Sequence, residues 1–157
     1  MKHIFIINPI SGRQDPTRGL VPQIQQAAAQ IGEECQIELT KYPGHGSELA
    51  KKYAQTGDEV RLYACGGDGT LNEVFNGAYQ FPNAQVAAVP CGSGNDFVRN
   101  FGTKQQFGSI QELMEGEPLW QAVETKKPYF QYDIYNRLVT CCDRWQAAFE
   151  RMKDMTE

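Results

Sequence analysis

The chain has 157 residues, which suits one ordinary domain and leaves little room for a second. Hydrophobic residues make up 41% and charged residues 22%, so the composition supports a packed core and is not that of a disordered chain. The net charge of -4 excludes the basic footprint of a nucleic-acid-binding protein. The negative net charge does not exclude a phosphate ligand, because backbone amides and a metal ion bind phosphate without a basic surface.

No stretch predicts a membrane span or a secretory leader. The apolar runs at residues 4–7 and 86–89 are far shorter than the roughly 20 residues that a span needs. The five cysteines form an odd set without a CxxC pair, so we expect neither a disulfide framework nor a zinc site. Reduced cysteines favour a cytoplasmic location.

Strand and helix patterns alternate along the first 116 residues. Apolar and β-branched runs predict strands over residues 3–7, 35–40, 60–65 and 85–89. Apolar residues at helical spacing predict helices that start at Asp15-Pro16, Gly46-Ser47, Thr70 and Ser109. The Thr70-x-x-Glu73 spacing is typical of a capping box, in which each side chain bonds a backbone N–H at the start of the helix.

Four β-α units in series predict an α/β fold with three layers, a parallel sheet covered by helices on both faces. Ligands of such sheets bind at the carboxyl ends of the strands. Three loops rich in glycine and asparagine fall there, at residues 8–12, 66–72 and 91–96. After residue 116 the pattern weakens: residues 120–130 show no clear period, residues 133–142 suit one strand and residues 144–155 a polar helix.

The glycine loops do not match two familiar nucleotide motifs. The sequence has no Gly-Lys pair for GxxxxGK[ST], and both Gly-x-Gly segments lack the third glycine of GxGxxG. Each loop still has the chemistry of a phosphate cradle, because glycine lets backbone N–H groups approach phosphate oxygens closely. We expect a Cβ at Gly67 to obstruct that approach and to strain the dihedral angles. The alternative for any single loop is a tight turn that merely requires glycine.

Asp68 is an unexpected residue in a phosphate cradle. A carboxylate about 4 Å from a phosphate charge would cost on the order of 4 kcal/mol at an effective dielectric of 20. Two uses would offset this cost: coordination of Mg²⁺, directly or through water, or acceptance of a proton from an attacking hydroxyl. The structural alternative is that Asp68 only caps the helix at Thr70. Asp96 has a weaker case, because it could equally cap the helix that follows it.

Three segments together resemble one known family. Asn8-Pro9-Ile10-Ser11-Gly12, the GGDGTLNEV run at residues 66–74 and the PCGSGNDF run at residues 90–97 are similar to motifs of the diacylglycerol kinase catalytic domain. This family includes sphingosine and ceramide kinases and is related to NAD kinases. The motifs occur in order at matching spacing, and the resemblance covers residues 1–116.

The resemblance implies that ATP binds to the loops with Mg²⁺, and that Asp68 is the catalytic residue and a metal ligand. The implied nucleotide contacts are Asn8, Pro9, Ile10, Ser11, Gly12, Thr40, Gly66, Gly67, Asp68, Gly69, Thr70, Leu71, Asn72 and Ser93. Thr40 and Ser11 rest on the resemblance alone. The implied reaction is transfer of the γ-phosphate to a lipid hydroxyl such as that of diacylglycerol, at a membrane surface contacted peripherally.

The chain departs from the family in its length. Members are about twice as long, with a second, β-rich domain that carries the main metal-binding loop and a proposed general base. We therefore expect residues 1–116 to be the nucleotide domain, residues 117–157 to be the start of a truncated second domain, and the fragment alone to be inactive. A NAD-kinase-like or 6-phosphofructokinase-like enzyme and a non-catalytic ATP-binding module are the alternatives. A homodimer is left open.

Overall fold

The computed structural model describes residues 1–99, 107, 109–116 and 138–139. Its elements are β1 (Lys2–Ile7), α1 (Thr17–Ile31), β2 (Cys35–Leu39), α2 (His45–Ala54), β3 (Val60–Gly66), α3 (Asp68–Ala78), β4 (Ala84–Pro90), α4 (Asp96–Arg99), α5 (Ile110–Glu115) and β5 (Leu138–Val139). The predicted alternation of strands and helices is confirmed. Each end of the four predicted strands lies within one residue of the observed end.

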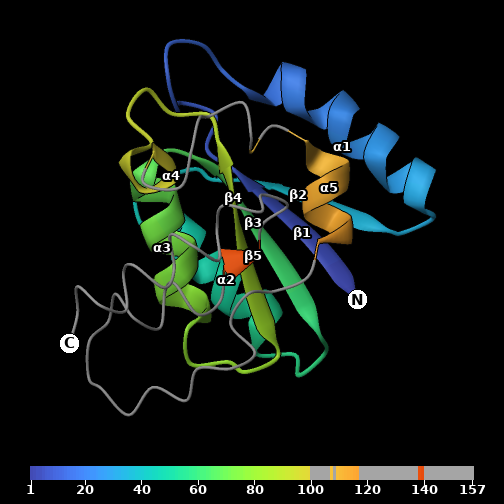
Figure 1. Cartoon of the computed structure of the whole chain (residues 1–157). Coiled ribbons are helices and arrows are strands. Elements are labelled where there is room, and N and C mark those ends of the chain that lie inside the picture. The colour runs from blue at the N-terminus through green and yellow to red at the C-terminus, as the bar shows by residue number, and fades with distance from the viewer. Residues whose placement is uncertain (100–106, 108, 117–137, 140–157) are drawn as a thin grey trace.

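The strands form one parallel sheet in the order β2-β1-β3-β4-β5 (Figure 1). The chain passes from β1 outward to β2 and then returns across β1 to β3. The direction of winding therefore reverses between β1 and β3, and in open α/β sheets such a switch point is where ligands bind. The strand predicted over residues 133–142 is described only at Leu138–Val139, which pairs with β4. The helix predicted over residues 144–155 lies outside the described residues, as does the rest of the expected second segment.

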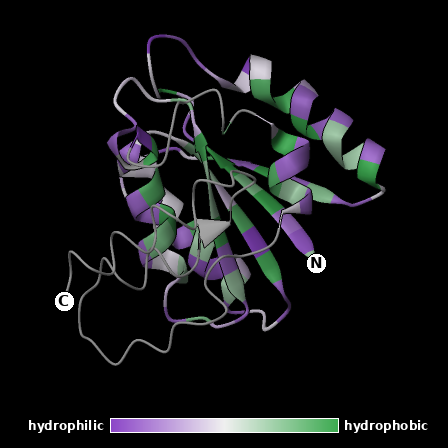
Figure 2. Ribbon diagram, in the orientation of Figure 1, coloured by the Kyte–Doolittle hydropathy of each residue, from purple (hydrophilic) through white to green (hydrophobic). Residues whose placement is uncertain are grey.

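Helices cover both faces of the sheet, so the predicted three-layer α/β class is confirmed. Alternate strand residues point to opposite faces. One set packs with α2 and α3 around Phe75 and Leu62, and the other packs with α1 and α5 around Phe5 and Ile24. Figure 2 shows the strands largely in hydrophobic colours, as a sheet buried on both sides requires. None of the helices in the described part of the chain has the length and apolar character of a membrane span.

Three predicted helix starts differ from the structure. Helix α2 begins at His45, one residue before the predicted start at Gly46. Helix α1 begins at Thr17, and the Asp15 carboxylate accepts the Thr17 N–H at 2.9 Å from just outside the helix. Helix α3 begins at Asp68, two residues before the predicted start, and its N-cap Gly67 has no side chain to cap it. Helix α1 ends at its C-cap Gly32. The predicted helix start at Ser109 is confirmed: Ser109 is the N-cap of α5, and its Oγ accepts the Glu112 N–H at 3.2 Å.

A buried polar cluster lies between the sheet and α5. His3, 3% exposed, bonds through Nδ1 to the Tyr63 hydroxyl at 2.7 Å. Arg61, 4% exposed, donates to the Leu113 and Met114 carbonyl oxygens at 2.9 and 2.7 Å. These carbonyls lie at the C-terminal end of α5, where a positive charge is favoured. Arg61 thus attaches α5 to the sheet.

This cluster makes the fold sensitive to mild acid. Burial, reinforced by the charge of Arg61 and opposed by that of Glu33, lowers the pKa of His3 from 6.5 to about 4. His3 is therefore neutral in the folded state at a pH where the unfolded chain binds a proton. Stability is fully present above about pH 6.5 and falls as the pH drops toward 4.

We predict that the free energy of unfolding decreases by about 2 kcal/mol between pH 7.5 and pH 5 through His3 alone. Urea unfolding at both pH values would measure it. In a His3→Gln variant, which does not titrate and can still bond Tyr63, the decrease should be smaller by that amount. An equal decrease in both proteins would contradict the prediction.

Candidate functional site

The three glycine loops meet at the carboxyl edge of the sheet, at the upper end of the strands in Figure 1. Each loop leaves its strand while still bonded to a neighbouring one. The Asn8 N–H donates to the Cys65 carbonyl and the Cys91 N–H to the Gly66 carbonyl, both at 2.9 Å. The sheet therefore delivers segments far apart in the sequence to one place.

The loops approach each other more closely than side chains would allow. A Cβ on Gly92 would lie 2.6 Å from the Gly67 Cα, and a Cβ on Gly12 would lie 2.6 Å from the Cys91 carbonyl oxygen. Gly12 also has φ +79°, a conformation that favours glycine. The expectation of strained dihedrals at Gly67 is wrong, because its φ of -93° suits any residue. The need for glycine in that contact lies with Gly92.

Asn8 and Thr70 join two of the loops across the switch point. The Asn8 side chain accepts the Ile10 N–H at 3.1 Å and donates from Nδ2 to Thr70 Oγ1 at 3.2 Å. The predicted capping box is therefore wrong. Thr70 Oγ1 is a partner of Asn8, and the Glu73 carboxylate bonds the start of a different helix, α2.

Asp68 joins a second pair of loops. Its Oδ2 accepts the Asp96 N–H at 2.9 Å, which connects the loop after β3 to the loop after β4. The alternative that Asp68 caps a helix at Thr70 is wrong, because the helix begins at Asp68 itself. The side chain is exposed at the edge of the sheet. Asp68 thus has both a structural contact and access to a ligand.

A pocket of about 320 Å³ opens at the switch point. We call it the switch-point pocket; it is lined by Asn8, Pro9, Ile10, Thr40, Lys41, Tyr42, Pro43, Gly69, Thr70 and Glu73. Six of these are predicted site residues, and Thr40 is among them. The sequence interpretation missed Lys41, Tyr42, Pro43 and Glu73. The loop at residues 41–44 follows β2 at the same edge of the sheet, and that position was the signal that could have identified it.

The other predicted site residues do not line this pocket. Gly67 lies near the buried Ser11, and the exposed Ser93 follows Gly92 in the loop after β4. Leu71 packs into the core, and its N–H donates to the Gly67 carbonyl at 3.1 Å. The structure therefore directs Leu71 into the fold and away from the pocket. The carbonyl of Asn72 accepts a hydrogen bond from Asn76, one turn further along α3.

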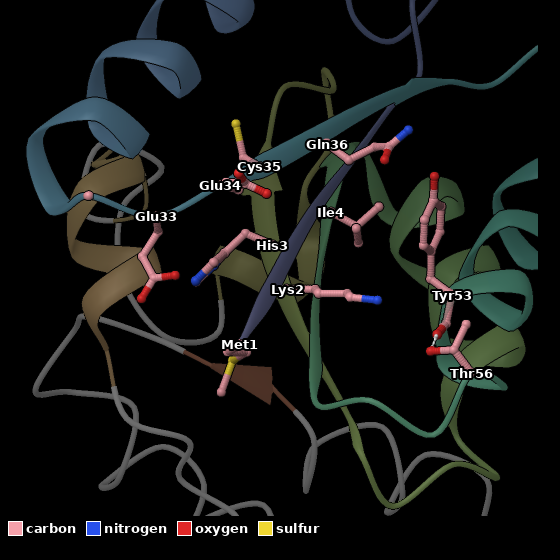
Figure 3. Close-up of a pocket in the computed structure, with 11 residues that line it drawn as sticks. Met1, Lys2, His3, Ile4, Glu33, Glu34, Cys35, Gln36, Tyr53 and Thr56 are labelled. Atoms are coloured by element: carbon pink, nitrogen blue, oxygen red, sulfur yellow. Dashed lines mark hydrogen bonds between the residues drawn. The ribbon is translucent and has the colours of Figure 1, made fainter.

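A second hollow, of about 490 Å³, lies at the opposite end of the sheet (Figure 3). Its lining wraps around the start of β1: His3 and Glu33 lie on one side of the strand, and Ile4 and Tyr53 on the other. None of the predicted site residues lines it. The polar groups do not converge on a common point, so the carboxyl edge is the stronger candidate for a site.

The described residues hold no group of three or more His, Cys, Asp or Glu side chains arranged to bind a metal ion. Mg²⁺ does not need such a group, because it keeps several waters and binds through one or two carboxylates together with substrate phosphates. Asp68, with an exposed carboxylate beside the glycine loops, fits that limited role.

The fold and the site define an α/β domain of the class shared by NAD kinases and diacylglycerol kinases. The protein-family model described as the diacylglycerol kinase catalytic domain matches residues 2–122, and the chain belongs to that family. A solved structure of a diacylglycerol kinase from Bacillus anthracis strain Sterne superposes with a TM-score of 0.56 at 29% identity, over 72% of this chain and 38% of that one.

Two curated relatives agree with this family assignment. A diacylglycerol kinase of Bacillus subtilis is 35% identical over 103 residues, which are 65% of this chain and 33% of that protein. The sphingoid long chain base kinase 5 of Saccharomyces cerevisiae is 37% identical over 105 residues, which are 60% of this chain and 15% of that protein. The matched region spans a third or less of either relative.

We predict that Gly92→Ala destabilises the chain by about 1–3 kcal/mol, because the new Cβ would meet backbone atoms that cannot move independently. Gly67→Ala is the matched control, since its Cβ would lie 3.5 Å from the Gly92 Cα, an ordinary contact. Urea midpoints of the two variants measure the difference. Equal, small losses would show that the loops tolerate a side chain at both positions.

Proposed function

We propose that this chain is the nucleotide-binding part of an ATP-dependent lipid kinase, which transfers the γ-phosphate of ATP to a lipid hydroxyl such as that of diacylglycerol. The observation that carries the proposal is the meeting of three glycine loops at the switch point of a parallel sheet. Family membership and the two kinase relatives described above support it.

The site divides into two parts that suit the two parts of ATP. The loops around Gly67 and Gly92 bring backbone close to backbone, which favours phosphate oxygens over bulkier groups. The first turn of α3 adds N–H groups that an α-helix leaves without intrahelical partners, and the positive end of its dipole. The switch-point pocket, with Ile10, Pro43 and two threonines in its lining, suits the nucleoside.

Asp68 is our candidate for the reactive carboxylate. Its position between the loops would bring it near the phosphates, where it would bind the water shell of Mg²⁺ or accept the proton of the attacking hydroxyl. When bound, Mg²⁺ would neutralise charge on the β- and γ-phosphates. The hydrogen bond from the Asp96 N–H holds the Asp68 carboxylate in one orientation.

Two other functions remain as competitors. A NAD-kinase-like or 6-phosphofructokinase-like enzyme would share the GGDG loop, and phosphorylation of diacylglycerol in vesicles against NAD in solution separates these from a lipid kinase. A non-catalytic ATP-binding module would bind ATP without transfer. We further propose that the complete enzyme works in the cytoplasm and meets its lipid by brief peripheral contact with a membrane.

We predict that millimolar Mg-ATP raises the melting temperature of this chain by several degrees, because a ligand of the native state stabilises it by mass action. Mg²⁺ without nucleotide is the control and should have little effect. Absence of any shift with Mg-ATP in a folded sample would overturn the proposed function.

We predict that Asp68→Asn leaves the melting temperature of this chain nearly unchanged, because the Asn side-chain oxygen can still accept the Asp96 N–H. At the matching aspartate of a full-length relative, the same change should lower turnover by about 10² or more, the scale of general-base catalysis. Asp68→Ala, which loses the contact between loops, should cost about 1 kcal/mol of stability.

Turnover of the Asn variant close to wild type would rule out the reactive role of Asp68. Metal-free ATP should bind the Asn variant of this chain as tightly as wild type or more tightly, because a carboxylate facing the polyphosphate has been removed. Isothermal titration calorimetry of both proteins in chelator checks this.

A further inference from the structure

Glu73 forms a long-range contact that the motif pattern does not predict. From α3, its Oε1 accepts the Gly44 N–H at 2.8 Å and its Oε2 accepts the Gly46 N–H at 3.0 Å. Gly44 is the N-cap of α2 and, as a glycine, has no side chain to bond the first turn of the helix. The Glu73 carboxylate takes over that function from 29 residues away, and the positive end of the α2 dipole favours its charge.

The packing around Glu73 leaves little freedom. A Cβ on Gly46 would lie 2.8 Å from Glu73 Oε2, and a Cβ on Gly77, one turn further along α3, would lie 2.2 Å from the Ser47 carbonyl oxygen. Glycines at both positions therefore let α2 lie directly against α3. The carboxylate and the two glycines together determine where α2 begins.

The start of α2 also determines one wall of the switch-point pocket. The segment from Lys41 to Pro43 lines the pocket and leads into Gly44. At its other end the Thr40 N–H is bonded to the Ile7 carbonyl at 2.9 Å. The wall is thus held at two points, by β1 before Lys41 and by Glu73 after Pro43.

The contacts of Glu73 also reduce the cost of a carboxylate in the pocket lining. Two N–H groups and a helix dipole offset its charge, and the pocket lining includes the apolar side chains of Ile10 and Pro43. A carboxylate placed here would repel a phosphate at close range. Next to Glu73 the lining therefore suits the nucleoside end of a nucleotide better than its phosphates, whereas Lys41, Gly69 and Thr70, which also line the pocket, are compatible with phosphate.

From these contacts we infer that Glu73 is a positioning residue for nucleotide binding: it holds the wall at residues 41–43 in place, so that the pocket selects the nucleoside part of ATP. This inference rests on the proposed function. Glu73 acts indirectly, by holding the start of α2 and with it the wall at residues 41–43, whereas Asp68 would face the phosphates.

The test compares Glu73→Gln with wild type in this chain. A Gln side chain offers one acceptor oxygen where Glu offers two, so one of the two glycine amides loses its partner. We expect hydrogen exchange at the Gly44 or Gly46 amide to speed up in the nucleotide-free protein. We expect the Kd for Mg-ATP to rise about tenfold, the scale of one lost hydrogen bond to a charged group, with little change in the Kd for inorganic tripolyphosphate.

Two further variants complete the design. Gly46→Ala, whose Cβ would displace the carboxylate, should reproduce the loss of ATP affinity with Glu73 intact. Glu59→Gln, at an exposed glutamate beside the amino end of β3, is the matched control and should leave every measurement unchanged. Circular dichroism checks that each variant is folded.

The outcomes separate the inference from the proposed function. If wild type does not bind Mg-ATP, the proposed function fails and the inference fails with it. If wild type binds Mg-ATP and Glu73→Gln binds it equally well, the inference alone is overturned. Equal losses for ATP and tripolyphosphate would also overturn it, because they would indicate a general disturbance of the site and not of the nucleoside wall.

Discussion

The close approach of backbone to backbone between Gly67 and Gly92 is the constraint on which the rest of the site depends. A Cβ on Gly92 would lie 2.6 Å from the Gly67 Cα, a distance that no packed structure accepts. Gly12 meets the Cys91 carbonyl in the same way. Because these positions have no side chains, the loops after three strands can lie against one another at one edge of the sheet.

The sheet makes this approach possible. All of its described strands run parallel, so their carboxyl ends meet at one edge, and both faces are covered by helices. The winding reverses between β1 and β3, and in open α/β sheets such a reversal leaves a crevice at the carboxyl ends of the two strands. The hydrogen bond from Asn8 to Thr70 spans this crevice, and both residues line the switch-point pocket.

Two carboxylates of α3 illustrate how one short motif serves two purposes. Asp68 and Glu73 are five residues apart, which places them about 140° apart around a helix. Asp68 therefore lies at the open edge of the loops, bonded to the Asp96 N–H, whereas Glu73 faces α2 and bonds two of its amides. The Gly-Gly-Asp-Gly-Thr-Leu-Asn-Glu segment thus contributes both to the contact between the loops and to the packing of α3 against α2.

The sequence by itself determined the α/β class, the four principal strands and the edge of the sheet at which the loops gather, because periodicity and glycine placement are local properties of the chain. It did not determine the partners of Thr70 and Glu73. Their spacing matched a capping box, but Asn8 and the glycines at the start of α2 compete for the same atoms. These partners lie 27 to 62 residues away, so only the packing of α2 against α3 and of β1 beside β3 decides the outcome.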